Sequence, residues 1–386
     1  MEPQSTPLGV ETAPTGANQA ASAEHNARLV LTLLREAGPL PGAEIARRAG
    51  LSAQAVSGIL RRLEEAGLVT RGAPLRGQVG KPRVPFAIAP AGAWAIGFKV
   101  GRGSLEAIAV DLGGTVHATR FAATPPKHPA TIDAFLEDAL PALVAGAAKA
   151  GLPRARLCGV GVAMPWHIWD WHPAAFVDSA DAGEAWRHYD LAAALRDRLG
   201  VPVWLRNDIS CAARAELVWG PRRVARDWAY FHLGALAGGG VVLDGRVRDG
   251  RQGNAGAFGS LTSGGVQLID RASLYLLEQA TGRPIPRLDW DGMGPVLDAW
   301  MDTAAPALAE AALNTCAVLD FQAVVIDGAM PAPVRDRLVA RVRRIVAGLD
   351  HRGLAVPQIE AGTLGPAARA LGGASVAFEQ GHFLSA

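Results

Sequence analysis

The sequence is poor in cysteine and in long apolar runs, and each scarcity excludes a class of protein. Only three of the 386 residues are cysteines, and no two of them form a C-x-x-C pair. Neither a disulfide framework nor a thiolate metal site is expected. No apolar run approaches the ~18 residues of a membrane-spanning helix. Residues 1–24 lack the basic-then-apolar pattern of a signal peptide. We therefore expect a cytoplasmic protein with free thiols and no membrane segment.

Apolar residues and glycine are abundant. Hydrophobic residues make up 49% of the chain, enough to fill a core, and the 45 glycines favour tight turns. This composition is typical of a compact α/β protein, and the length favours two or three domains. Residues 1–24 are rich in proline, alanine and threonine, so we expect a disordered tail there.

Positive charge is concentrated near one end of the chain. The formal net charge is +2 overall, but residues 24–90 contain ten Lys or Arg against five Asp or Glu. A local excess of this kind is typical of a small phosphate-binding module carried by a partner domain of near-neutral charge.

The pattern within this basic region predicts a helix-turn-helix. Apolar residues at helical spacing predict helices over 26–36, 42–49 and about 53–66. Gly50 supplies the turn between the second and third helices, and Ser52 is placed to cap the third. Strands expected over 68–71 and 84–89 would add a β-hairpin, or wing. Residues 25–90 are therefore predicted to form a winged helix-turn-helix domain, all-α with a β wing.

The exposed face of the third helix carries groups that suit a DNA groove. Short polar side chains and an amide can reach base edges, and arginines can bind phosphate or guanine. Basic residues in the wing suit a minor groove. The alternative is a three-helix packing unit whose arginines are merely solvated. The predicted DNA-binding residues are Ser52, Gln54, Ser57, Arg61, Arg62, Lys81 and Arg83.

The pattern changes from Trp94 onward. Short apolar runs over 95–100, 105–111 and 116–121 predict a β-meander, which a helix over 132–150 and a strand over 157–163 follow. Four stretches then carry a family resemblance: GVGVAMP (159–165), VWLRNDISCAARAE (203–216), LAGGGVVLDGRVRDG (236–250) and GNAGAFGS (253–260).

In order and spacing these stretches resemble the ROK family, named for repressors, open reading frames and kinases, and in particular its xylose-repressor and N-acetylglucosamine-repressor branch. The resemblance implies a winged helix before an α/β domain with the two-lobed sugar kinase fold of actin-like ATPases, related to ribonuclease H. That effector and dimerisation domain would span 91–386. Its small lobe would take about 91–205 with a C-terminal return, and its large lobe about 206–365.

The resemblance also shows where a kinase site is eroded. Residues 111–115 (Asp-Leu-Gly-Gly-Thr) match the motif of the family's first phosphate loop, but they follow the second strand of the meander, whereas the family's loop follows the first. The matching position is one strand earlier, where Lys99 replaces the carboxylate and cannot hold Mg²⁺ as an aspartate does. The second phosphate loop, 234–240, has lost a hydroxyl and a glycine. Asp208 stands at the position where kinases of the family have the base that takes a proton from the sugar hydroxyl. We predict a vestigial Asp208, no catalytic residues and no cofactor.

The sequence also departs from G-E-x-G-H, the family's motif for sugar and zinc binding. Ala257 and Ser260 stand where the family has glutamate and histidine, and no cysteine follows. No structural metal is expected.

A cleft between the two lobes is expected to bind a small effector. Three tryptophans within residues 166–171 could stack on a sugar or aromatic ring. The alternative is that they pack in a dimer interface or a lobe core. The predicted effector-binding residues are Trp166, His167, Trp169, Asn207, Asp208, Asn254, Ala257 and Ser260.

The sequence thus predicts a DNA-binding transcription regulator, with a repressor favoured over an activator. Its DNA binding would be controlled by a sugar-like effector. Its partners would be double-stranded DNA with an inverted repeat and a second copy of the chain, as a homodimer or a dimer of dimers. Two alternatives stay open. One is an ATP-dependent sugar kinase with an attached DNA-binding domain, and the other is a regulator controlled by a protein partner.

Overall fold

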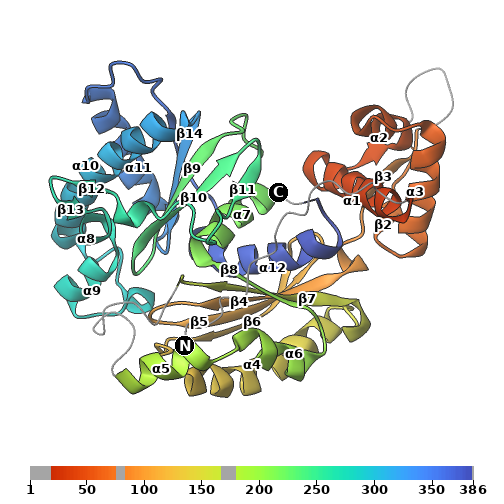
Figure 1. Ribbon diagram of the computed structural model, residues 1–386, viewed down its shortest axis with the longest axis horizontal. Coiled ribbons are helices and arrows are strands. Elements are labelled where there is room, and N and C mark those ends of the chain that lie inside the picture. The colour runs from red at the N-terminus through yellow and green to blue at the C-terminus, as the bar shows by residue number, and fades with distance from the viewer. Residues whose placement is uncertain (1–18, 75–82, 167–179, 385–386) are drawn as a thin grey trace.

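The computed structural model describes residues 19–74, 83–166 and 180–384. They form an N-terminal domain and two larger lobes, which lie side by side in Figure 1. Among the described helices, none combines the length and the apolar character needed to cross a membrane.

The N-terminal domain is the predicted winged helix. Gly50 adopts φ +65° between the second and third helices, and Ser52 caps the third helix through an Ala55 N–H to Oγ hydrogen bond of 3.1 Å. The three strands pair in the order β1-β3-β2. The elements are α1 (Gln19–Ala37), β1 (Leu40–Pro41), α2 (Gly42–Ala49), α3 (Ala53–Glu65), β2 (Val69–Arg71) and β3 (Pro85–Ile88).

The first helix differs from the sequence prediction. It begins at Gln19, so residues 19–24, which we assigned to a disordered tail, are helical. Its buried positions are Val30, Leu31 and Leu34, whereas Leu29 and Leu33 are only half-buried. The helix packs both on its own domain and on the C-terminal segment of the chain. Because of this second contact, Leu31 is buried as well as Val30 and Leu34.

The small lobe is a five-stranded sheet of order β6-β5-β4-β7-β8. Strands β4, β5 and β6 form the predicted antiparallel meander, and β7 and β8 continue in parallel from β4. Three helices, α4, α5 and α6, lie along one face (Figure 1). The bounds are β4 (Trp94–Val100), β5 (Leu105–Asp111), β6 (Val116–Ala122), α4 (Pro129–Lys149), β7 (Leu157–Met164), α5 (Ala180–His188), α6 (Leu191–Leu199) and β8 (Val203–Asn207).

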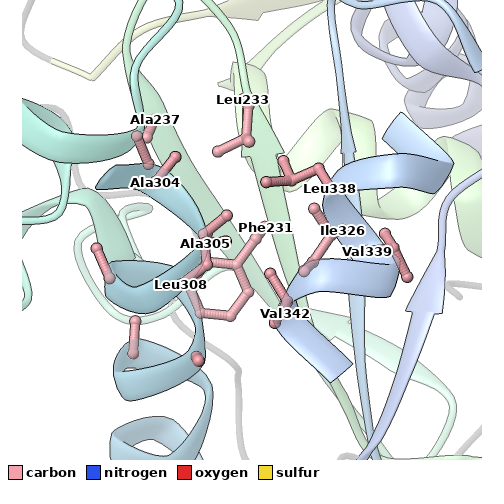
Figure 2. Close-up of a cluster of buried hydrophobic side chains, with 14 of the residues drawn as sticks. Phe231, Leu233, Ala237, Ala304, Ala305, Leu308, Ile326, Leu338, Val339 and Val342 are labelled. Atoms are coloured by element: carbon pink, nitrogen blue, oxygen red, sulfur yellow. The ribbon is translucent and has the colours of Figure 1, made fainter. Parts of the chain in front are cut away.

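The large lobe repeats this plan with a sheet of order β11-β10-β9-β14-β15. Figure 2 shows Phe231 and Leu233 of the sheet packed between Leu308 of α10 and Leu338 of α11. The bounds are β9 (Trp228–Leu233), β10 (Ala237–Leu243), β11 (Arg246–Arg248), β12 (Thr262–Ser263), β13 (Val266–Gln267), α8 (Ile269–Ala272), α9 (Tyr275–Thr281), α10 (Gly294–Leu319), β14 (Ala323–Gly328), α11 (Ala332–Gly348) and β15 (Gln358–Ala361).

Two helices join the lobes, α7 (Asp208–Trp219) and α12 (Ala368–Gly381). They pack on each other, and α12 also covers the face of β4 and β7 that α4 leaves free. Glycines make this possible. A Cβ added at Gly372 would lie 1.8 Å from the Cys211 carbonyl oxygen, and one at Gly161 would lie 1.7 Å from that of Gly373. Through α12, the chain returns to the small lobe near its C-terminal end.

Candidate functional site

The third helix of the N-terminal domain presents the predicted DNA-reading face. Its apolar side is buried through Val56, Ile59, Leu60 and Leu63, as the helical spacing predicted. The opposite side is solvent-exposed and includes Ser57. A shallow surface hollow of about 410 Å³ is lined by residues that include Ser52, Gln54, Gly58, Arg61 and Arg62.

The chemistry of this hollow suits a groove of DNA. A Cβ added at Gly58 would meet nothing within 4 Å, so the hollow has open space at that glycine. Arg61 is held only loosely, 3.9 Å from Glu65, with both side chains largely exposed. An exposed guanidinium with so weak a partner can turn toward phosphate or a guanine edge.

Only part of the wing is described. Arg83 is exposed just before β3, and the predicted contact Lys81 lies outside the described residues. Arg71 of β2 is tied down instead, because it pairs with Glu64 at 2.8 Å and lies over the Phe86 ring at 5.4 Å.

Asp208 and Arg369 form an ion pair between the two joining helices. Asp208 is the first residue of α7 and is 6% exposed, and its Oδ2 lies 3.2 Å from Nη1 of Arg369 in α12. Asn207 caps α7 by accepting the N–H groups of Ile209 and Ser210. Burial raises the pKa of Asp208 above its ordinary value, against the opposing effect of Arg369. Asp208 is therefore a buried, paired carboxyl group.

Lys99 lies near the end of β4, in the same buried region. It is 5% exposed, and its Nζ donates a hydrogen bond of 2.6 Å to Ser104 Oγ. Burial, and then the positive charge of Arg369, lower the pKa of Lys99 to about 7. Asp111, in the stretch that imitates the phosphate loop, pairs with Trp94 at the other end of the β4–β5 hairpin. There it accepts the N–H groups of Gly113 and Thr115 in a turn, and its Oδ2 lies 2.7 Å from His117 Nε2.

Five of the other predicted effector residues lie in the described part of the chain, and two of them, Asn207 and Asn254, meet beside Asp208. Asn207 Nδ2 and Asn254 Oδ1 are 3.4 Å apart, and Trp166 Nε1 donates to the Gln252 carbonyl oxygen at 3.0 Å. Ala257 and Ser260 are exposed on the segment that follows. The remaining two, His167 and Trp169, lie outside the described residues. Across the part of the chain that the structure describes, no three His, Cys, Asp or Glu side chains are grouped as a metal site requires.

A cavity of about 460 Å³ opens on another side of the Asp208–Arg369 pair. Its lining includes Lys99, Ser104, Ala235 and Arg369, but none of the described effector residues that the sequence predicted. Sequence analysis pointed to part of this cavity, because the family resemblance places Lys99 and Ala235 at the positions of its two phosphate loops. It did not point to Arg369, since 161 positions separate Arg369 from Asp208.

The joining helices also reach the DNA-binding domain. Arg214 of α7 pairs with Glu379 of α12 at 2.5 Å, and both side chains are buried. Arg28 of α1 donates hydrogen bonds to the carbonyl oxygens of Glu379 and Phe383. A continuous set of contacts therefore links the Asp208–Arg369 pair to the first helix of the winged domain.

Comparison with known proteins finds a match for each part of the chain. A ROK family model matches residues 95–267, and a MarR family model matches residues 25–77. An uncharacterised protein, y4fQ, of Sinorhizobium fredii is 27% identical over 93% of this chain and 92% of its own length. The xylose repressor of Bacillus subtilis is 22% identical over 61% of this chain and 60% of its own length.

Solved structures resemble the whole arrangement. A ROK family transcriptional regulator, described as a homologue of the E. coli MLC protein, matches with a TM-score of 0.64 and 19% identity, over 92% of this chain and 96% of that one. A ROK family glucokinase from Streptomyces griseus, solved with glucose and AMPPNP, matches with a TM-score of 0.56 and 23% identity, over 74% of this chain and 99% of the other. At these identities the likeness establishes the fold, including the kinase-like lobes that we predicted.

Proposed function

From the premise that this chain is a ROK family protein with a MarR-like winged-helix domain, we propose that it is a transcription repressor controlled by a small ligand. The α3 surface is the observation that carries the proposal. An exposed polar and basic helix face, preceded by a capped turn, is the part of a winged helix that enters the major groove. The similarity to the xylose repressor of Bacillus subtilis supports the same interpretation.

The proposed effector is a sugar-like molecule beside Asp208. Trp166, Asn207 and Asn254 supply a ring face and amide groups close to that carboxyl. Sugar hydroxyls are bound by planar polar side chains of this kind, and aromatic rings pack against the apolar face of a sugar ring. His167, Trp169, Ala257 and Ser260 belong to the same proposed site.

We also propose that the lobes have no kinase activity. Phosphoryl transfer needs a neutralised phosphoryl group held in line with an active base. Lys99 stands at the matching metal-carboxylate position, and a cation there repels Mg²⁺. Asp208 is engaged by Arg369 at 3.2 Å, so one of its oxygens is already occupied.

The joining helices offer a route from effector to DNA. An effector that prefers one arrangement of the lobes shifts the balance between arrangements by its difference in affinity. Asp208 and Arg369 lie at the start of α7 and α12, and Glu379 lies near the far end of α12, against Arg28 of the DNA-binding domain. A 14-residue helix spans about 20 Å, so α12 carries a shift at the cleft to α1 as a rigid rod.

Selection of DNA from a random duplex pool tests the DNA-binding part. We expect the full chain to enrich one inverted repeat, because a single α3 reads too few base pairs and two copies must pair. Gln54→Ala and Arg61→Ala should abolish or relax the enrichment, since each removes a group that can contact a base. Arg352→Ala is the matched control, because this arginine is 92% exposed and its ion-pair partner among the described residues is the neighbouring Asp350. Failure of the unmodified chain to enrich any sequence would refute the proposal.

Turnover of ATP tests the second part. With hexoses and N-acetylhexosamines as acceptors and Mg²⁺ present, we expect no sugar-dependent ADP release above the level of Asp208→Ala. Sugar-dependent release that disappears in Asp208→Ala would instead establish a kinase.

A further inference from the structure

The cavity beside the Asp208–Arg369 pair has the size and lining of a ligand site. Its volume of about 460 Å³ lies within the range of roughly 300–1,000 Å³ found for small-molecule pockets. It is bounded by the β4–β5 turn of the small lobe, by the segment after β14 and by the start of α12. A ligand there would touch both lobes and the joining helix.

Two of the cavity's four cations are already neutralised. Arg102 pairs with Glu278 at 3.0 Å across the lobes and lies over the Tyr275 ring at 5.7 Å. Arg335 lies 3.4 Å from Asp327 and 3.3 Å from Asp336. These two arginines form part of the cavity wall. Because their charges are balanced by carboxylates, they contribute little to the binding of an anion.

The other two cations, Lys99 and Arg369, are incompletely satisfied. Lys99 hydrogen-bonds a hydroxyl, and among the described residues no carboxylate lies within ion-pairing distance of its Nζ. Arg369 has one carboxylate partner, Asp208, but its Nε is buried and has no acceptor within the described residues. The two positive charges also repel each other, and the charge of Arg369 lowers the pKa of Lys99. Glu106, opposite Lys99 on β5, and Asp208 supply negative charge nearby, but Arg369 Nε still has no acceptor among the described residues. An anion that contacts both cations would accept hydrogen bonds from the donors that these carboxylates leave unused.

His232 does not line the cavity but lies close to Arg369. It is fully buried on β9, and neither ring nitrogen has a partner in the described part of the chain. A Cβ added at Gly234 would lie 3.6 Å from the His232 ring and 3.8 Å from Arg369 Nη1, so both side chains approach the same glycine. Leaving a polar group buried and unpaired costs roughly 1–3 kcal/mol, so such groups are normally retained for a partner.

Much of the remaining wall is apolar, although Glu106 and Thr363 also line it. The apolar part includes Ile285, Pro286 and Trp290 of the large lobe, Met330 after β14, and Leu364 and Pro366 before α12. An indole face and a set of aliphatic side chains suit a flat, ring-sized apolar body.

We propose that this cavity binds a small organic anion, with its anionic group between Lys99 and Arg369 and its ring against Trp290. The anionic group is a carboxylate or a phosphate, which share the chemistry that two buried cations recognise. This site is separate from the sugar-like effector site, and the proposal does not depend on DNA binding.

Calorimetry of the full chain without DNA tests the proposal with three matched probes: 2-naphthoate, 2-naphthyl phosphate and the neutral 2-naphthamide. We expect at least one of the two anions to bind one per chain, and the neutral amide to bind at least tenfold more weakly. A preference between the two anions identifies the anionic group. Equal binding of the amide and both anions, or no binding of any probe, would overturn the proposal.

Three variants locate the bound probe. Lys99→Met keeps the length of the side chain and removes its charge, and we expect a loss of tenfold or more for the anion but not for the amide. Trp290→Ala should weaken all probes that bind. Arg352→Ala, on the far surface, should change nothing. Wild-type affinity for the anion in folded Lys99→Met, shown folded by its circular dichroism, would place the anion elsewhere and contradict the assignment.

Discussion

Lys99 is the side chain on which the proposed lack of kinase activity most depends. It lies almost fully buried on β4, opposite Glu106 of β5, and donates a hydrogen bond to the Ser104 hydroxyl. A buried ammonium of this kind opposes folding unless it loses its proton or gains an anion. The position therefore costs stability in the free protein, which is typical of residues retained for a function.

The substitution Lys99→Met tests that cost through its pH dependence. The pKa of Lys99 is about 7 in the folded chain against an ordinary value of 10.5, lowered by burial and Arg369 and raised in part by Glu106 and Asp208. Below pH 7 the lysine is protonated in both states, so the whole cost of its burial opposes folding. Between pH 7 and 10.5 the folded chain releases the proton while the unfolded chain keeps it, and this cost fades.

We therefore expect Lys99→Met to raise the melting temperature by several degrees at pH 6, and to lose most of that advantage by pH 9.5. Thermal unfolding followed by circular dichroism across this range provides the measurement. If the rise in melting temperature is the same at every pH, the charge on Lys99 does not destabilise the folded protein.

Local patterns predicted individual positions of the winged helix well. The four buried residues of α3 and the Ser52 cap follow from helical spacing and from the hydroxyl that precedes the helix. Arg369 and Glu278 could not be found in this way. Their partners, Asp208 and Arg102, are 161 and 176 positions away, and only the folded chain brings them together.

Among the helices and strands, the contact between α7 and α12 depends most on residue size. Both helices are buried between the lobes, and glycines let their backbones meet. The sequence predicted most strands and helices of the small lobe. It missed β1, because a strand of two residues has no periodicity, and it missed the first turns of α1, whose composition resembles that of the preceding tail.

Two alanine substitutions within α12 test this packing. Gly372→Ala places a methyl group about 1.8 Å from the Cys211 carbonyl oxygen, so the helices must separate. Overpacking of this kind costs roughly 1–3 kcal/mol or more, and we expect a fall of several degrees in the melting temperature. Gly381→Ala is the matched control, since its methyl group meets nothing within 4 Å and alanine favours the helix. Equal melting temperatures for the two variants would contradict the packing described here.

In the molecule as a whole, the DNA-binding domain is not a loosely tethered module. One apolar cluster includes Val30 and Leu31 of α1 and Ala374 and Phe378 of α12. A movement of α12 relative to the lobes would therefore change the position of α1, and with it that of α3. In a paired repressor such a change alters the spacing of the two reading helices, which must match successive major grooves.

The ratio of specific to non-specific DNA affinity tests the central claim most directly. Fluorescence anisotropy would be recorded in about 0.15 M salt, with the duplex enriched by the full chain and with a scrambled duplex of the same composition. We expect the enriched duplex to bind at least about 10³-fold more tightly, with that ratio reduced tenfold or more in Gln54→Ala and unchanged in Arg352→Ala. A ratio near one for the unmodified chain, or the same ratio in Gln54→Ala, would contradict the assignment of α3 as a sequence-reading helix.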